Sequence, residues 1–232
     1  MKIKWIIPAL TAIALLTACA PTASEPTVTA VPPATEPVSI ATEAAVSTPA
    51  PAAQTMEEGL IYMREEEKLA HDVYVFLYDK WGLQTFQNIA ASEQAHTDAV
   101  KSLLDAYGLP DPAAGAQIGQ FANSNLQALY DQLTVQGSLS LADALKVGAA
   151  IEEIDILDLQ AHLAGDLPDD VRLVYENLLF GSYNHLSAFT SALLRQTGET
   201  YAPQYMTLEA YQEALSIANA GGNGNGYRGG RP

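Results

Sequence analysis

A glutamate and a histidine, Glu93 and His96, stand three residues apart in the helical stretch NIAASEQAHTDAVKSLLDAYG (residues 88–108). A three-residue step places both side chains on the same face of a helix. That face is otherwise apolar, with Ile89 before the pair and Val100 after it. Carboxylates and imidazoles are ligands for divalent metals. Acidic helices often contain such a pair by chance, so the pair alone is a weak indication of a metal site.

Three other helical segments interrupt an apolar stripe in the same way. Steps of three and four residues define each stripe, and polar groups occupy the middle of each one. Unpartnered buried carboxylates are costly, and like charges raise one another's pKa. Because two divalent cations would neutralise such a cluster, we predict a metal centre. The predicted ligands are Glu67, Glu93, His96, Glu152, Asp155 and His185.

The elements that must position these ligands are helices. Thr55 and Glu58 form a capping-box pattern, and Gly108 and Gly198 are typical of helix C-termini. The predicted long helices span 56–81, 85–107, 141–163 and 168–196, and the short ones span 125–135 and 207–218. No run of alternating β-branched residues predicts a strand.

The lengths of the connections predict the topology. Short turns join the first long helix to the second and the third to the fourth, so each pair should be antiparallel. The connection from Leu109 to Leu139 is long and carries the short helix over 125–135. We therefore predict an all-α, ferritin-like four-helix bundle with one long crossover, followed by a short C-terminal helix.

Residues 57–195 resemble the ferritin-like superfamily of di-metal carboxylate proteins and, more narrowly, the bacterial domain of unknown function DUF2202. The resemblance is carried by four stretches: YMREEEKLAHDVYVFLYDKWG, NIAASEQAHTDAVKSLLDAYGLPDP, ALKVGAAIEEIDILDL and VYENLLFGSYNHLSAF. The first helix of the superfamily often has Glu, then Ala three and Tyr seven residues later. Glu67, Ala70 and Tyr74 match this pattern, which selects Glu67 over the glutamates beside it.

The last long helix departs from the superfamily pattern. Related di-iron proteins usually supply Glu-x-x-His there, whereas this chain has Ser182 three residues before His185. Asp155 is a candidate to fill the missing ligand place, and whether one metal binds or two stays open. His71, Tyr74 and Ser182 are candidates for contacts to the ligands. His71 could equally be a surface histidine, and Tyr74 a core aromatic.

The resemblance implies a di-iron centre, with manganese or another divalent metal as an alternative cofactor. It also implies oxygen or peroxide chemistry or the oxidation of ferrous iron, which would make the protein a di-iron oxidoreductase. No catalytic residue beyond the metal ligands is assigned. Two alternatives remain, a non-enzymatic metal-binding or metal-sensing protein of the cell envelope and a metal-free helical interaction module.

Some charged residues beside the predicted ligands call for no function. Glu65, Glu66 and Lys68 are expected on a solvated face of the first long helix. Of the pair that follows Ile151, Glu152 is expected to point inward, and Glu153 outward into solvent, because Glu152 lies on the apolar stripe. His162 is explained most simply by a favourable contact with the helix dipole.

The N-terminus reads as an export signal. Lys2 and Lys4 precede an apolar run, and the segment Leu16-Thr17-Ala18-Cys19 resembles the lipobox of bacterial lipoproteins. We predict a lipoprotein signal peptide over 1–19, lipidated at Cys19, which is the only cysteine. An ordinary cleaved signal peptide is the alternative.

Composition divides the rest of the chain. Residues 20–55 are rich in Pro, Ala and Thr and predict a disordered tether, 56–219 form the predicted ferritin-like domain, and 220–232 are a Gly-rich tail predicted to be disordered.

The net charge of −16 disfavours nucleic acid as a partner. The expected partners are metal ions and oxygen or peroxide, with a homodimer as an open alternative. The expected location is outside the cytoplasm, on a bacterial membrane and facing the periplasm or the exterior, with the lipid as the sole membrane contact.

Overall fold

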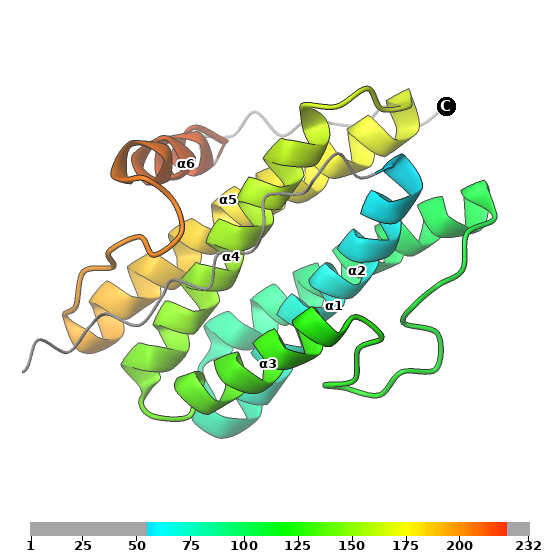
Figure 1. Cartoon of the computed structure of the whole chain (residues 1–232). Helices are drawn as coiled ribbons and strands as arrows, with labels where there is room; N and C mark the ends of the chain where they lie inside the picture. The colour runs from blue at the N-terminus through cyan, green and yellow to red at the C-terminus, as the bar shows by residue number, and fades with distance from the viewer. Residues whose placement is uncertain (1–54, 222–232) are drawn as a thin grey trace, which may run out of the picture. The chain divides into compact units, whose positions relative to one another are not determined.

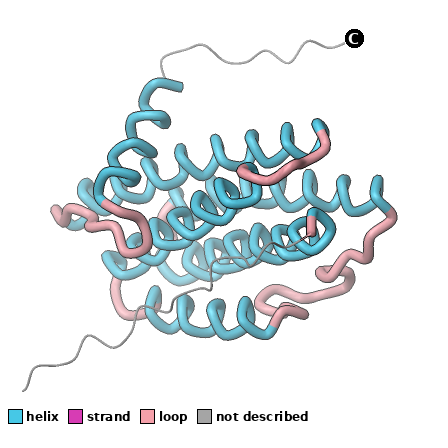
Figure 2. Tube along the Cα trace, turned by 45° about the horizontal axis from the view of Figure 1, so that its top comes forward, coloured by secondary structure: helices cyan, strands magenta, loops and turns pink. Residues whose placement is uncertain are grey.

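The computed structural model describes residues 55–221, and these contain helices and loops without a strand (Figure 2). The all-α class is therefore confirmed. The predicted signal peptide with Cys19, the tether up to residue 54 and the tail after residue 221 lie outside the described residues. The helices are α1 (Met56–Trp81), α2 (Gln84–Tyr107), α3 (Ser124–Gly137), α4 (Leu141–Leu163), α5 (Asp169–Thr197) and α6 (Leu208–Gly221).

Four long helices form a bundle of two antiparallel hairpins, α1 with α2 and α4 with α5 (Figure 1). The bundle closes because α1 also packs against α4, and α2 against α5. The crossover between the hairpins carries α3, which packs on both α1 and α4, while α6 lies against α5. Between residues 55 and 221, no helix combines the length and apolar character needed to cross a membrane.

The capping residues predicted at the start of α1 and at the end of α2 form the expected caps. The Thr55 hydroxyl accepts a hydrogen bond from the backbone N–H of Glu58, and the Glu58 carboxylate accepts one from the Thr55 N–H, so the predicted capping box forms. Gly108 adopts a left-handed conformation with φ of 65° at the end of α2, where a side chain would be strained.

Two clusters of buried apolar side chains fill the bundle, one toward each end. The cluster nearer the start of α1 consists of Leu60, Met63, Val100, Leu103, Leu104, Leu159, Val171, Tyr175 and Leu178. The larger cluster includes Tyr74, Phe86, Leu145 and Phe189 from the same four helices. On α1 and α2 the polar residues of the predicted centre fall between these two clusters, and on α4 and α5 they lie where residues of one cluster are followed by residues of the other, so apolar layers cover them from both ends.

The expected solvated face of α1 is wrong, because Glu65, Glu66 and Lys68 are all buried. The crossover covers two of these residues. Glu65 accepts hydrogen bonds from the backbone N–H groups of Ala122 and Asn123, at 2.5 and 3.0 Å. Lys68 pairs with Asp72 and donates to a backbone carbonyl of the crossover. These buried charges therefore attach the crossover to the bundle.

The outward orientation expected for Glu153 is also wrong. Glu153 is fully buried and accepts hydrogen bonds from three consecutive backbone N–H groups, those of Gln204, Tyr205 and Met206. The segment between α5 and α6 folds back over α4 and places its unpaired N–H groups on this carboxylate. A helical stripe identifies the side of α4 that faces its long neighbours, but it does not reveal that a distant loop covers the other side.

Candidate metal centre

Glu93 lies at the middle of the polar layer, and each of its carboxylate oxygens faces a different histidine. Its Oε2 lies 2.8 Å from Nδ1 of His96, and its Oε1 lies 2.7 Å from Nδ1 of His185. Glu67 Oε2 is 3.3 Å from the His96 nitrogen, and Glu152 Oε2 is 3.5 Å from the His185 nitrogen. All four helices of the bundle thus contribute to one cluster.

The cluster divides into two groups of three that share Glu93. Within each group, one candidate ligand atom per residue lies within 4.8 Å of the other two. The first group is Glu67, Glu93 and His96, and the second is Glu93, Glu152 and His185. A carboxylate common to both groups has the arrangement expected of a ligand that bridges two cations.

Several inward atoms have no hydrogen-bond partner within the described residues. They include Oε1 of Glu67, Oε1 of Glu93 and Nδ1 of His185. The last two atoms lie 2.7 Å apart without forming a hydrogen bond with each other. Because buried polar atoms are almost always satisfied, these atoms call for a further partner, and a cation placed among them would provide it.

The orientation of His185 is set by Ser92, one residue before Glu93. Nε2 of the imidazole lies 3.0 Å from the Ser92 hydroxyl, which leaves Nδ1 directed at the carboxylates. A hydrogen bond to the outer nitrogen is how proteins usually fix the orientation of a ligating histidine. The two imidazoles lie side by side, with ring centroids 5.5 Å apart.

Without a metal, the two histidines are the counter-charges of the cluster. Burial lowers the pKa of His96, but hydrogen bonds and charge from Glu67 and Glu93 raise it overall to about 11. Burial also lowers the pKa of His185, but the charges of Glu93 and Glu152 raise it overall to about 10. Burial raises the pKa of Glu67 well above its ordinary value. Carboxylates therefore outnumber the cationic groups that could neutralise them.

Asp155 lies beside Ser182, the residue at which the sequence departs from the Glu-x-x-His pattern. The Ser182 hydroxyl donates a hydrogen bond to Oδ2 of Asp155, and Oδ1 has no partner among the described residues. Burial, followed by the charge of Glu152, raises the pKa of Asp155 to about 8. Asp155 belongs to neither group of three, so it lies beside Ser182 without joining either group.

Of the other candidates, Tyr74 contacts a predicted ligand and His71 does not. The Tyr74 hydroxyl donates to Oε1 of Glu152 at 2.5 Å, and its ring packs against Phe189. The His71 ring instead lies 2.8 Å from Asp72, outside the polar layer. Tyr74 therefore holds Glu152 in place, whereas His71 belongs to the crossover side of α1.

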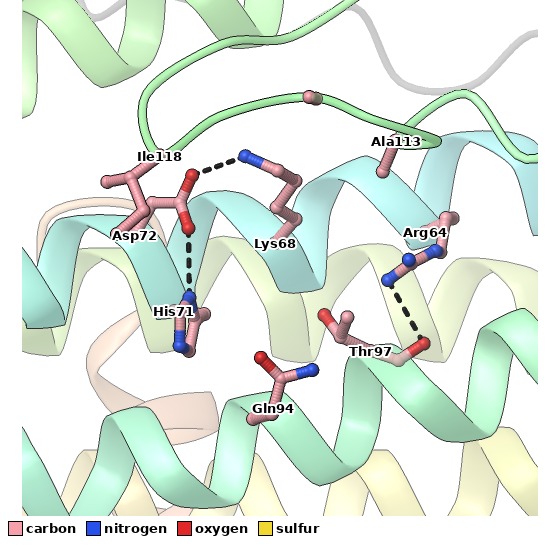
Figure 3. Close-up of a pocket in the computed structure, with 9 residues that line it drawn as sticks. Arg64, Lys68, His71, Asp72, Gln94, Thr97, Ala113 and Ile118 are labelled. Carbon is pink, nitrogen blue, oxygen red and sulfur yellow. Dashed lines mark hydrogen bonds and ion pairs between the residues drawn. The ribbon is translucent and has the colours of Figure 1, made fainter.

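That side of α1 borders a cavity of about 230 Å³ between α1, α2 and the crossover (Figure 3). Its charged groups are already paired: Lys68 and His71 both contact Asp72, and Arg64 donates to the backbone carbonyl of Thr97 (Figure 3). None of the six predicted ligands lines it. The cavity and the carboxylate cluster are therefore separate features.

Gly181 is a feature of the site that the sequence analysis missed. A Cβ atom on this residue would lie 2.6 Å from Cε1 and 2.7 Å from Nε2 of His96. The absence of a side chain on this turn of α5 therefore leaves the space that the imidazole occupies. Ser92 was missed too. Neither residue interrupts an apolar stripe, so the pattern held no signal for them.

Gly181→Ala is expected to displace the His96 ring and to weaken metal binding at the Glu67–Glu93–His96 group by roughly tenfold, the scale for disturbing the support of a ligand. Binding at the other group should change less. The metal-free variant should remain folded, since alanine favours a helix over glycine. Titration with Co²⁺, followed by its visible absorption, measures both affinities. Equal weakening of both, or of neither, would contradict this assignment.

Comparison with known proteins places the domain in a family. Residues 56–218 match DUF2202, described as an uncharacterized protein domain. The uncharacterized protein MJ0754 of Methanocaldococcus jannaschii is 49% identical over 172 residues, which cover 74% of this chain and 92% of that protein. A crystal structure of the hypothetical protein MJ0754 matches with a TM-score of 0.68 and 51% identity, covering 72% of this chain and 94% of that one. The chain therefore belongs to the DUF2202 family.

Proposed function

We propose that this domain is a ferritin-like bundle that binds two divalent metal ions, with iron the best fit and Glu93 between the two. The observation that carries the proposal is the orientation of Glu93, whose two oxygens face His96 and His185 at 2.8 and 2.7 Å. Each group of three offers carboxylate oxygens and one imidazole nitrogen, a set that suits iron and manganese.

Charge balance supports two cations. Glu67, Glu93 and Glu152 are buried in the cluster with two imidazoles, and Asp155 is a fourth buried carboxylate beside it. Once the imidazoles are neutral ligands, two divalent ions offset the four negative charges in full. The inward atoms that lack hydrogen-bond partners would also acquire them.

A bound iron pair would supply electrons to oxygen or peroxide, or would itself be loaded as ferrous substrate and oxidised. The chain's own residues prepare the site for this. Ser92 orients His185, and Tyr74 holds Glu152. The apolar clusters above and below exclude water, which strengthens the interactions of the charged ligands with a cation.

Metal uptake is expected to release protons and to strengthen as pH rises from 6 to 9. With pKa values of about 11 and 10, His96 and His185 are protonated at neutral pH in the metal-free protein, and each must lose its proton to ligate. Apparent affinity should therefore rise roughly tenfold per pH unit for each proton displaced. Calorimetry in two buffers of different ionisation enthalpy counts these protons. An affinity independent of pH would argue against ligation by these imidazoles.

The direct test uses the purified full-length chain. It is loaded with ferrous iron without oxygen, and bound metal is measured by elemental analysis. Two equivalents support the proposal, and no bound metal in a folded protein overturns it. Oxygen is then added, and ferric absorbance is compared with that of iron in buffer alone. Faster oxidation indicates an oxidoreductase.

A non-enzymatic role is the second candidate, and Ser182 favours it. The serine supplies no carboxylate where related di-iron helices do, and Asp155 lies outside both groups of three. Bound iron with no acceleration of oxidation would support metal binding or sensing without catalysis.

We also propose that the protein is exported and lipid-anchored at Cys19, on the strength of the lipobox-like segment alone. Cys19→Ser should abolish incorporation of labelled fatty acid in bacterial cells. Equal labelling of the variant and the wild type would contradict the assignment.

A further inference from the structure

Glu66 is a buried carboxylate that the proposed centre does not use. It is 4% exposed, and its Oε2 atom has no hydrogen-bond partner among the described residues. Burial, followed by the charges of Asp158 and Asp155, raises its pKa well above the ordinary value. The geometry agrees: Glu66 lies one turn after Tyr62 on α1, and the Tyr62 hydroxyl donates to Asp158, so this face of α1 meets α4. Asp155 and Asp158 stand three residues apart and so share one face of α4.

These acids form a series that runs inward from the protein surface. Asp158 is half-buried and accepts a hydrogen bond from the Tyr62 hydroxyl at 3.3 Å. Glu66 is buried beside Asp158, and Asp155 is buried beside Glu152, a candidate ligand. Among the described residues, no Lys or Arg forms an ion pair with Asp158, Glu66 or Asp155.

Tyr175 of α5 is a second buried side chain with an unpaired oxygen atom. Tyr175 is 1% exposed, and its hydroxyl has no hydrogen-bond partner within residues 55–221. Burial, followed by the negative charges of Glu66 and Glu67, raises its pKa. Its ring belongs to the same buried cluster as Met63, which stands three and four residues before these glutamates on α1. An unpaired phenol and an unpaired carboxylate oxygen are thus both buried at this end of the bundle. Both atoms would gain a partner when a hydrated cation passes.

We propose that Tyr62, Asp158 and Glu66 line a transit path by which divalent cations move from solvent, between α1 and α4, to the metal centre. This inference rests on the proposed function, because it needs a metal destination. In the described part of the chain, ligand groups of three occur only at the two Glu93 groups. Glu66 and Asp158 offer two carboxylates and no imidazole, so they should hold a cation more weakly than the centre does. Favourable but weak binding is what transit requires.

The test measures how fast the full-length, metal-free chain takes up Co²⁺, mixed rapidly and followed by its absorption. Glu66→Gln and Asp158→Asn should each slow uptake by about tenfold, because each removes a carboxyl group that can hold an arriving cation, and Glu66 gives up its proton when it does so. Bound Co²⁺ at saturation should stay at the wild-type level. Uptake by the wild type should slow as salt is added, and this dependence should weaken in Asp158→Asn, which removes the acid nearer the surface.

Asp79→Asn is the matched control, since Asp79 is an exposed acid on α1, and its uptake rate should equal the wild-type rate. Unchanged rates in Glu66→Gln and Asp158→Asn would overturn the path while leaving the metal centre standing. A lower amount of bound Co²⁺ at saturation would also overturn it, because the residues would then be ligands or structural supports. No Co²⁺ uptake by the wild type would overturn both. Should Glu66→Gln fail to fold, the half-buried Asp158→Asn decides alone.

Discussion

Glu93→Gln is expected to lose both metal ions, with each apparent affinity falling by at least about 100-fold, the upper end of the scale for removing a supporting contact. Glu93 is the one residue common to both groups of three, and its two oxygens face different histidines. Glutamine keeps the size of the side chain but loses the charge and one of the two acceptor oxygens. Elemental analysis after loading with ferrous iron or Co²⁺ measures the loss.

Single substitutions in each of the two groups of three distinguish the role of Glu93, which both groups share, from a general effect of removing charge. Glu67→Gln should weaken the first metal more than the second, and Glu152→Gln should do the reverse, because each belongs to one group. Glu176→Gln, at an exposed position of α5, is the matched control and should bind two equivalents. Retention of both metals by folded Glu93→Gln protein would exclude the bridge.

Glu153→Ala is expected to destabilise the fold by about 3 kcal/mol, or to lower Tm by roughly 6–12 °C. The substitution removes the shared acceptor of three backbone N–H groups, those of residues 204–206. The loss is smaller than three separate hydrogen bonds, because the segment can detach and let its amides bond to water. Thermal melting gives Tm, and hydrogen exchange at residues 204–206 shows whether that segment is the part released.

Glu213→Ala serves as the comparison, because Glu213 is exposed on α6 and should leave Tm within about 2 °C of the wild-type value. Metal binding should persist in Glu153→Ala below its Tm, since the hydrogen bonds of the Glu153 carboxylate within the described residues go to residues 204–206 and not to a candidate ligand. A Tm unchanged by Glu153→Ala would show that the three hydrogen bonds add nothing to stability.

Helix positions and the polar interruptions could be predicted because both depend on local periodicity. Apolar residues three and four apart identify the face that packs inward, and a Glu or His on that face must lie in the polar layer between the apolar clusters. Glu67, Glu93, Glu152 and His185 come together for this reason. The capping box at Thr55 was equally local, because the four residues 55–58 contain it.

Periodicity of a single helix says nothing about what covers its other faces. Glu65 and Glu153 appeared to be solvated because their partners lie more than 50 residues away, in the crossover and in the segment before α6. Proximity of Ser182 to Asp155 could be suggested by spacing, but only the packing of α5 on α4 placed their side chains in contact.

The sequence by itself determined an all-α bundle and the set of residues that interrupts its apolar stripes. It could do so because helix periodicity depends only on residues three and four positions apart in the chain. The tertiary structure decided how those residues are used. It turned the two oxygens of Glu93 toward different histidines, and it separated Glu66, beside Asp158, from Glu67, one residue away. Adjacent residues on a helix point about 100° apart, so which neighbour each one meets depends on how four helices pack together.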